Sequence, residues 1–383
     1  MAKILIITWN FPPTIGGIEN LISEIHTTLK QRHDVTVITS GSHKREDESG
    51  VLQVKSGNVL LFMFKSFFVS LKLLVKGKYD LILAGSLLIN PVAVVCGVIT
   101  RTPVISMSYG LDIIYSHPLY QLFIRSAWNR DRAIVAISEN SRKLLLERGV
   151  KPEIPFLIHP GLSRKFVEKI GGATPAGEIR KKYGIGSRPC LVSVGRLTKR
   201  KGIYPFVTRC VPKILESVPE CVLLIVGDDP SQALVHREGE MSLVRKVVKD
   251  KGLENNVIFA GKINDADLMG VYGAGDLFIF PVIEVPNDVE GFGMVAIEAA
   301  VFGKPSVASR IGGIPDAVED GVAGILVEPG DYHAFAEVVV KLLKDCSLRE
   351  RLGEQARMRV NDRFSWDKLA LLWDELITKV TVV

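Results

Sequence analysis

The sequence predicts an α/β protein made of two doubly wound units, each a parallel sheet covered by helices on both faces. Short apolar runs alternate with longer helical patterns along the chain, and the runs form two successive series. The first series of expected strands is 4–8, 35–39, 81–84, 104–106 and 133–137. The second series is 191–194, 222–226, 257–260, 277–280, 306–308 and 325–327.

A stretch of small residues, 171–177, separates the two series and indicates where one unit gives way to the next. We therefore expect one domain over 1–164 and a second over 165–365. After Asp331 the pattern is helical throughout, and an amphipathic helix beginning at Trp366 is expected to end near Thr378.

Composition narrows the class of partner. The chain has 383 residues, 47% of them hydrophobic, which is enough for two cores. Its net charge of +6 suits anionic substrates or an anionic membrane surface, and without an Arg-rich patch interleaved with aromatics we expect no nucleic-acid partner. Five scattered cysteines without CxxC spacing, and an apolar strand in place of a secretion signal at the start, favour reduced core cysteines in a cytoplasmic protein.

Two segments raise the question of a membrane. Residues 81–100 are uncharged and long enough to span a bilayer, but Asn90-Pro91 interrupts them, so we expect a strand, a loop and a helix beginning near Pro91. Residues 59–78 form an apolar helical pattern without acids, in which Lys65, Lys72 and Lys76 share one face. This helix is either a peripheral one that docks on anionic lipid or a core helix with solvated lysines.

The most informative residues are Glu290 and Glu298, one in a glycine-rich loop and the other in the apolar helix that follows. Carboxylates accept hydrogen bonds from the vicinal hydroxyls of a sugar or ribose, and the free N–H groups at a helix start attract a diphosphate. A charge among apolar neighbours, as at Glu298, is costly unless it is paired or bound. This pattern predicts a pocket for a nucleotide sugar.

A diphosphate beside carboxylates needs compensating cations. Residues 191–202 read as a buried strand ending at Gly195, followed by a turn that carries Arg196 and Lys201. These two side chains suit a phosphate-bearing leaving group. The pairs Asp228-Asp229 and Asp288 with Glu290 resemble metal-binding carboxylates, but Arg, Lys and a helix N-terminus already supply the neutralisation, so we expect no metal ion.

Four segments, in this order and spacing, resemble retaining glycosyltransferases of family 4, which have the two-domain GT-B fold. They are 11–19, 194–202, 290–298 and 312–321. The resemblance implies an acceptor-side Rossmann-like domain over 1–164, a donor-binding one over 165–365, and a C-terminal helix, 366–383, that crosses back to the first domain.

The resemblance also implies roles. Arg196 and Lys201 would neutralise the departing nucleoside diphosphate, Glu290 would contact hydroxyls of the transferred sugar, and Glu298 would hold the ribose. The backbone near residue 262 would read the base, and a Gly-Gly turn before the first helix would approach the donor phosphates or the acceptor. The expected donor-binding set is Gly16, Gly17, Gly261, Lys262, Ile263, Phe292, Gly293, Met294, Val295 and Glu298.

One position departs from the family pattern. Many relatives carry His-Gly-x-Asp after the fourth or fifth strand, where this chain has Tyr109-Gly110-Leu111-Asp112. A tyrosine keeps a hydrogen-bonding tip but cannot share a proton near neutral pH as imidazole does. Tyr109 and Asp112 are therefore acceptor-side candidates and not an assigned acid–base pair.

The expected activity is retaining, metal-independent transfer of a hexose from a UDP- or GDP-sugar to an acceptor hydroxyl, with no cofactor. The acceptor would be a lipid-linked or cell-surface glycan, or a small molecule. Two alternatives stay open: another GT-B sugar-nucleotide enzyme, such as an epimerase or phosphorylase, and a non-catalytic partner of a glycosyltransferase complex.

Overall fold

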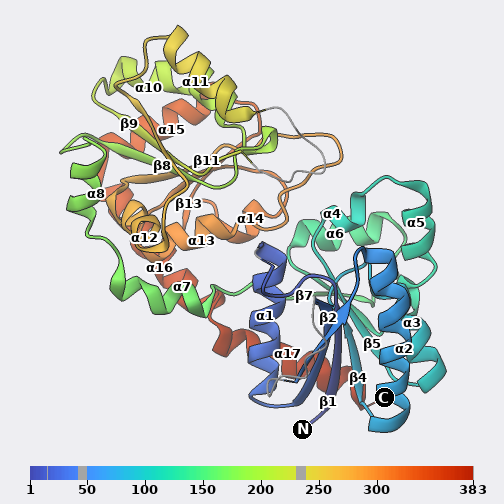
Figure 1. Cartoon of the computed structure of the whole chain (residues 1–383). Coiled ribbons are helices and arrows are strands. Elements are labelled where there is room, and N and C mark those ends of the chain that lie inside the picture. Colours follow the sequence, from blue (N-terminus) through green and yellow to red (C-terminus); the bar gives the residue numbers. More distant parts are fainter. Residues whose placement is uncertain (15, 42–49, 230–238, 383) are drawn as a thin grey trace. The chain divides into compact units, whose positions relative to one another are not determined.

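The computed structural model describes residues 1–14, 16–41, 50–229 and 239–382 (Figure 1). The chain divides into two compact units. The first comprises Met1–Arg164 together with Ser365–Val383, and the second comprises Lys165–Phe364. Each unit is a parallel sheet with helices on both faces, as the alternating sequence pattern predicts. The acceptor-side and donor-side roles of the two halves stay predictions.

The sheet of the first unit has the strand order β3-β2-β1-β4-β5-β6-β7, with every neighbouring pair parallel. Its strands are β1 Lys3–Thr8, β2 Asp34–Gly41, β3 Val51–Lys55, β4 Leu81–Ala84, β5 Val104–Ser108, β6 Ala133–Ala136 and β7 Pro155–Leu157. The two edge strands, β3 and β7, were not among the predicted strands. Both are short and only partly buried, so neither carries the continuous apolar run of a central strand.

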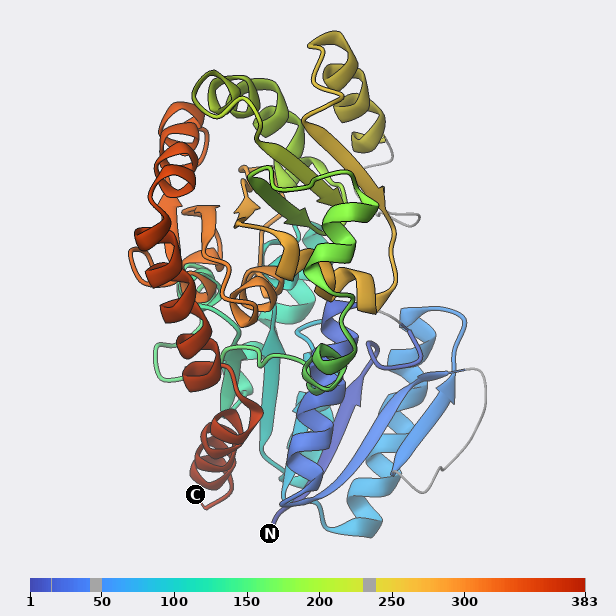
Figure 2. The ribbon, with the colours of Figure 1, turned by 90° about the vertical axis from the view of Figure 1, so that its left-hand side faces the viewer.

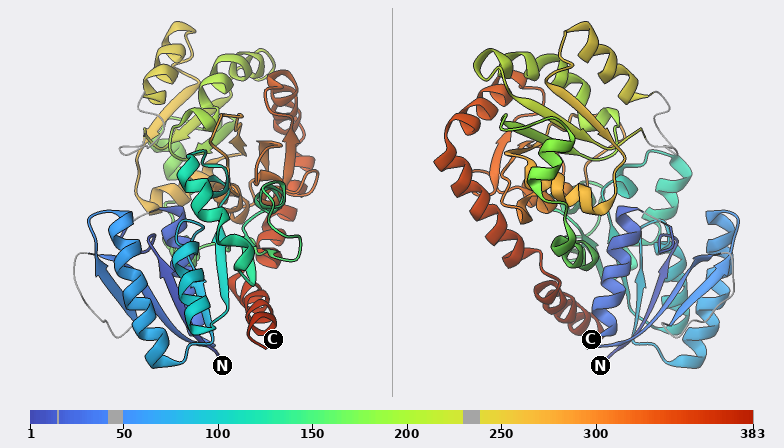
Figure 3. Two further views of the ribbon diagram at one scale, coloured as in Figure 1. Left: turned by 90° about the vertical axis from the view of Figure 1, so that its right-hand side faces the viewer. Right: turned by 60° about the vertical axis from the view of Figure 1, so that its left-hand side comes forward.

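Helices cover both faces of this sheet, with α1 on one face and α2 and α3 on the other (Figure 2). The helices of the unit are α1 Gly17–Lys30, α2 Val59–Gly77, α3 Asn90–Thr100, α4 Leu111–Ile114, α5 Pro118–Arg125, α6 Glu139–Glu147 and α17 Trp366–Thr381. The last helix, α17, runs three residues past the expected Thr378 and packs beside α1 (Figure 3, right). There His33 Nε2 lies 3.0 Å from Asp374 Oδ1.

The uncharged segment 81–100 forms β4 and α3, as expected, and α3 carries Pro91 in its first turn. Within the described residues, no helix combines the length and apolarity that crossing a bilayer requires. Segment 59–78 forms α2, whose start is capped by the Asn58 side chain accepting from Leu61 N at 2.9 Å.

The sheet of the second unit has the order β10-β9-β8-β11-β12-β13, again parallel throughout. All six predicted strands are present, as β8 Cys190–Val194, β9 Val222–Val226, β10 Val257–Gly261, β11 Leu277–Phe280, β12 Ser306–Ser309 and β13 Gly324–Val327. The helices are α7 Arg164–Lys169, α8 Ala176–Lys182, α9 Ile203–Pro205, α10 Val211–Ser217, α11 Glu240–Asp250, α12 Asp265–Ala274, α13 Met294–Val301, α14 Ile314–Ala317, α15 Tyr332–Lys344 and α16 Cys346–Arg363.

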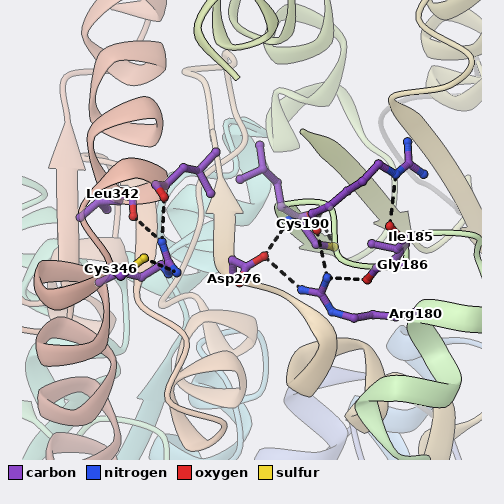
Figure 4. Close-up of polar contacts among 11 residues, drawn as sticks. Arg180, Ile185, Gly186, Cys190, Asp276, Leu342 and Cys346 are labelled. Atoms are coloured by element: carbon purple, nitrogen blue, oxygen red, sulfur yellow. Dashed lines mark hydrogen bonds and ion pairs between the residues drawn. The ribbon is translucent and has the colours of Figure 1, made fainter. Parts of the chain in front are cut away.

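At the amino ends of β8 and β11 a polar network joins the two strands (Figure 4). The Arg180 guanidinium donates to the carbonyl of Gly186 at 3.1 Å and to Asp276 at 3.1 Å, and Asp276 accepts from the backbone N–H of Cys190 at 2.7 Å. The Arg180 and Asp276 side chains therefore hold the two strands together at this edge. Ligands of open parallel sheets bind at the opposite edge, outside the carboxyl ends of the strands.

The cysteines are all free, and four of them are buried as predicted. Cys346 is exposed, which contradicts its interpretation as a core residue, because it opens α16 at the surface next to Arg349 (Figure 4).

Candidate active site

The second sheet has one point where its strand order reverses, between β8 and β11. The chain steps outward from β8 to β9 and β10 on one side, and through β11, β12 and β13 on the other. In open parallel sheets, ligands bind outside the carboxyl ends of the strands at such a point. Here the loops after β8 and β11 carry residues 195–202 and 281–293.

The loop after β8 is pressed against the loop after β11. Gly202 has a left-handed backbone with φ of 68°, and a Cβ there would lie 1.9 Å from the carbonyl oxygen of Pro281, so only glycine fits. The backbone N–H of Ile283 donates to the Arg200 carbonyl at 2.9 Å. These contacts hold the basic residues of one loop against the acidic residues of the other.

Four charged side chains meet there. Lys201 Nζ lies 2.8 Å from Glu290 Oε2, and Arg200 Nη1 contacts the same oxygen. Arg200 Nε also donates to Asp288 Oδ1 at 3.0 Å. All four side chains are largely shielded from solvent, with exposed fractions between 13 and 17%. Two cations therefore balance two carboxylates in a sheltered cluster.

Burial and pairing act in opposite directions on these groups. Burial alone would raise the pKa of Glu290, but the positive charges and hydrogen bonds of Lys201 and Arg200 outweigh it and lower that pKa. The pKa of Lys201 is also lowered, because burial and the neighbouring guanidinium groups outweigh the attraction of Glu290. Glu290 is thus held ionised beside two positive charges.

The loop that carries Glu290 rests on the Gly312-Gly313 turn. The N–H of Gly313 donates to the carbonyl of Glu290 at 2.8 Å, and a Cβ on Gly313 would lie 2.0 Å from the carbonyl oxygen of Gly291. Packing explains why glycines occupy both positions of this turn, because without side chains one backbone can lie directly against another.

Glu298 lies in the middle of α13, whose N-cap is Gly293. Its Oε2 accepts from the hydroxyl of Tyr272 at 2.7 Å, and burial raises the pKa of Glu298 while Tyr272 and Lys201 act against that rise. Gly293, the N-cap of α13, offers no side chain to the first N–H groups, which the helix itself does not satisfy. Phe292 is buried against Phe364, with ring centroids 5.5 Å apart, so only its backbone can line the site.

Other residues of the predicted donor-binding set lie at the same edge of the sheet. Gly261 ends β10, and its carbonyl accepts from Gly227 N at 3.0 Å, while Gly195 N donates to Val226 at 2.9 Å. The loops after β8, β9 and β10 are therefore side by side. Arg196 and Lys262 are exposed and make no ion pair within the described ranges. A small cavity in this region is lined by Ser193, Val194, Gly195, Arg196, Leu197, Lys201, Ile203, Ile225, Val226 and Phe280.

The acceptor-side candidates belong to the first unit, near the reversal between β1 and β4. The Tyr109 hydroxyl donates to the carbonyl of Gly85 at 2.8 Å, and Asp112 accepts from the N–H of Tyr109 at 2.8 Å. Both side chains are engaged in holding loops. Gly16 caps α1, and a Cβ there would lie 2.1 Å from Glu19 Oε2, whereas a Cβ on Gly17 would meet nothing within 4 Å.

Sequence reasoning missed three residues of the site. Arg200 lies in the turn that carries Arg196 and Lys201 and was assigned no role, Asp288 was weighed only as half of a metal pair, and Tyr272 was not considered. Adjacency to Lys201 and Glu290 was the available signal for Arg200 and Asp288; Tyr272 carried none. Among the described residues, no three His, Cys, Asp or Glu side chains gather where they could hold a metal ion.

Comparison with known proteins places the chain in a family. The model for glycosyl transferases group 1 matches residues 176–359, and the model for glycosyltransferase family 4 matches residues 15–165. A GDP-mannose-dependent alpha-(1-6)-phosphatidylinositol monomannoside mannosyltransferase from Mycolicibacterium smegmatis is 26% identical, with 95% of each chain covered. The N-acetyl-alpha-D-glucosaminyl L-malate synthase of Bacillus anthracis is 31% identical, over 72% of this chain and 68% of that protein.

Solved structures agree on the fold. The crystal structure of HepE from Anabaena in complex with UDP superposes with a TM-score of 0.79 at 21% identity, covering 98% of this chain and 100% of that one. The relatives, the two matching models and the shared architecture lead to one conclusion. The chain belongs to glycosyltransferase family 4 and is a glycosyltransferase of the GT-B fold.

Proposed function

We propose that this glycosyltransferase moves a hexose from a UDP- or GDP-sugar to an acceptor hydroxyl, with retention of anomeric configuration and without a metal ion. The observation that carries the proposal is the sheltered cluster of Lys201, Arg200, Glu290 and Asp288 at the strand reversal of the second unit. It supplies fixed positive charge and a shielded carboxylate at the edge where ligands bind in such sheets.

In this proposal each charged group has one task. Arg196, exposed and unpaired within the described residues, and Lys201 neutralise the diphosphate as the glycosidic bond breaks. Glu290 accepts hydrogen bonds from hydroxyls of the transferred sugar. Both cations contact its Oε2, and in the part of the chain that the structure describes Oε1 makes no hydrogen bond. Arg200 keeps the carboxylate ionised and in place while Lys201 engages phosphate.

The ribose is assigned to Glu298, whose carboxylate is oriented by Tyr272. The N–H groups at the start of α13 face the phosphates in this proposal, with Gly293, Met294 and Val295 contributing backbone. The backbone of Gly261, Lys262 and Ile263 reads the base. For retention, the acceptor attacks from the face that the leaving phosphate vacates, and the phosphate oxygen takes its proton.

The base and sugar of the donor, and the class of acceptor, can be proposed from the relatives. Mannosyltransferases named as GDP-mannose-dependent are among the relatives that align over nearly the whole chain, which makes GDP-mannose the first donor to test. Their named acceptor, a phosphatidylinositol mannoside, likewise makes a glycolipid the first class of acceptor.

A thermal-shift panel tests the donor site. UDP, GDP, ADP, UDP-glucose, UDP-N-acetylglucosamine and GDP-mannose are compared with and without magnesium, because a ligand that binds only the folded state raises its stability. We expect one base to stabilise the protein without metal. Stabilisation by none, or only with magnesium, would contradict the proposal.

A product assay with the winning donor then tests the reaction. Transfer needs an added acceptor, whereas epimerisation of the donor does not, and phosphorolysis needs inorganic phosphate. We expect turnover only with acceptor and an α-configured product from an α-configured donor, read by NMR. Inversion, or turnover without acceptor, would overturn the assignment.

A further inference from the structure

The helices α2 and α3 of the first unit lie side by side on one face of the sheet (Figure 3, left). The thiol of Cys96 on α3 lies 3.8 Å from the carbonyl of Phe67 on α2, which marks the direct contact between them. The inner side of α2 is apolar as expected. Phe62, Met63 and Leu74 are buried in the core between the helices and the sheet.

The outer side of α2 is apolar as well, and that is unusual for a helix on the surface of a globular unit. Leu60, Phe64, Phe68 and Val75 recur at spacings of four, four and seven residues, so they form one stripe along the helix. Their exposed fractions are 74, 64, 54 and 70%. A stripe over most of a 19-residue helix is about 25 Å long, at 1.5 Å of rise per residue.

Helix α3 continues this surface. Val95, Val98 and Ile99 point outward and are about half exposed or more. Neither core packing nor solubility explains so many large exposed apolar side chains on two adjoining helices. We call the exposed residues of α2 and α3 the apolar platform: Leu60, Leu61, Phe64, Phe68, Val75, Val95, Val98 and Ile99.

The charge around the platform is mostly positive. Lys72 and Lys76 are exposed beside the stripe on α2, and Lys78 and Arg101 are exposed just beyond the ends of α2 and α3. Lys65 is less free, because its ammonium donates to the Lys55 carbonyl at 2.8 Å.

Acidic residues are scarce in the whole region. Residues 51–130 contain eight basic and two acidic residues, Asp80 and Asp112. Both acids are engaged by backbone N–H groups, Asp80 by that of Lys3 and Asp112 by that of Tyr109. A surface with an apolar centre and a predominantly basic rim, where Asp80 is an exposed acid, is complementary to a bilayer with anionic headgroups and an apolar interior.

We propose that the apolar platform is a docking surface for an anionic lipid bilayer, with α2 and α3 lying in the plane of the interface. The apolar stripe enters the boundary between headgroups and acyl chains while Lys72, Lys76, Lys78 and Arg101 reach anionic headgroups. In this proposal α2 combines the two alternatives that the sequence left open. Its inner face is that of a core helix, and its outer face is the lipid-docking surface. Docking requires no donor or acceptor, so the proposed function and this one fail separately.

Vesicle flotation with the full chain tests docking. We expect binding to phosphatidylcholine vesicles containing 30% phosphatidylglycerol, little binding to pure phosphatidylcholine, and weakening of the anionic binding as salt rises. Lys72→Glu with Lys76→Glu should lower partitioning at least about tenfold. The matched control is Lys151→Glu with Lys165→Glu, two exposed lysines outside α2 and α3, and it should bind as the parent does.

A second variant tests the apolar part. Phe64→Gln with Phe68→Gln should lower partitioning at least about tenfold and leave the salt dependence of residual binding unchanged. Leu371→Gln, at an equally exposed apolar position on α17, is its control. Unchanged melting temperatures establish that each variant is folded.

Three results would overturn the proposal: no binding to anionic vesicles, equal binding to neutral and anionic ones, or no loss in either pair of platform variants. A second copy of the chain is the competing occupant. Sedimentation in lipid-free buffer would show it as a dimer that Phe64→Gln with Phe68→Gln dissociates, and a platform buried in that dimer would also overturn lipid docking.

Discussion

Each sheet has one place where its strand order reverses, and near both places a sheltered carboxylic acid follows the strand ends. In the second unit it is Glu290, which faces Lys201 and Arg200, and their charges lower its pKa against the effect of burial. In the first unit it is Asp112, which faces backbone N–H groups, and there burial prevails and raises the pKa to about 6.

The difference shows that topology decides where a ligand can bind, and the neighbouring charges decide what chemistry is available there. The second unit holds paired positive and negative side chains at its reversal, which suits the proposed diphosphate and sugar. The first keeps a carboxyl that burial makes easier to protonate and that holds loops, with Tyr109 turned to the carbonyl of Gly85. Four substitutions test this contrast.

Glu290→Gln should have the largest effect. The substitution keeps the size of the side chain and removes its charge, so we expect transfer to slow by about a hundred- to a thousandfold. Diphosphate affinity should stay within about threefold, since Lys201 and Arg196 remain. Steady-state kinetics and calorimetry measure the two quantities. The control is Glu284→Gln, in the exposed part of the same loop; equal losses of rate and affinity would remove the sugar contact assigned to Glu290.

Asp112→Asn tests the carboxyl of the first unit, whose pKa burial raises. Because the pKa of Asp112 is raised from 3.8 to about 6 in the folded state, the unfolded chain loses its proton first as pH rises, and the folded state is destabilised between pH 4 and 6. The variant has no carboxyl at this position, so its folded state does not lose this stability as pH rises. Relative to the parent, its free energy of unfolding should rise by up to about 3 kcal/mol between pH 4 and 7.

Urea unfolding at a series of pH values measures that difference. Glu153→Gln, at an exposed carboxylate of the same unit, is the control. A difference between Asp112→Asn and the parent that does not change with pH would mean that Asp112 is ionised over the whole pH range, like Glu290. The two carboxyl groups would then not differ.

Lys201→Ala should weaken binding of the nucleoside diphosphate by about ten- to thirtyfold, the loss expected for one charge-assisted hydrogen bond. Calorimetry measures it. Lys199→Ala removes a neighbouring exposed lysine of the same turn and should change affinity little. An unaltered affinity in Lys201→Ala would place the diphosphate elsewhere.

Tyr272→Phe should have the smallest effect. It removes the hydroxyl that orients Glu298, and we expect donor affinity to fall about three- to fivefold, with the turnover rate nearly unchanged. Tyr204→Phe, on a partly exposed tyrosine of the same unit, is the matched control. If only the turnover rate changes, Tyr272 acts on the reacting sugar and not on the ribose side.

The sequence by itself determined the two-unit α/β architecture, all the central strands, and the segments that carry the site. These are local properties: an apolar run between turn residues becomes a strand, and a Gly-rich turn before a helix is recognisable wherever it lies. Lys201 and Glu290 were predicted to serve one ligand, and the structure brings them together. Their roles in catalysis stay predictions.

Tertiary structure decided the other site residues, the edge strands and the exposure of α2, because each of these depends on contacts with residues far away in the chain. Arg200 became part of the site through Glu290, 90 residues on, and Tyr272 through Glu298, 26 residues on. The edge strands β3 and β7 exist because a neighbouring strand offers its hydrogen bonds, not because of their own composition. An amphipathic pattern cannot say whether the outer face of α2 is covered; only the folded unit, with Phe64 and Val75 exposed, shows that it is not.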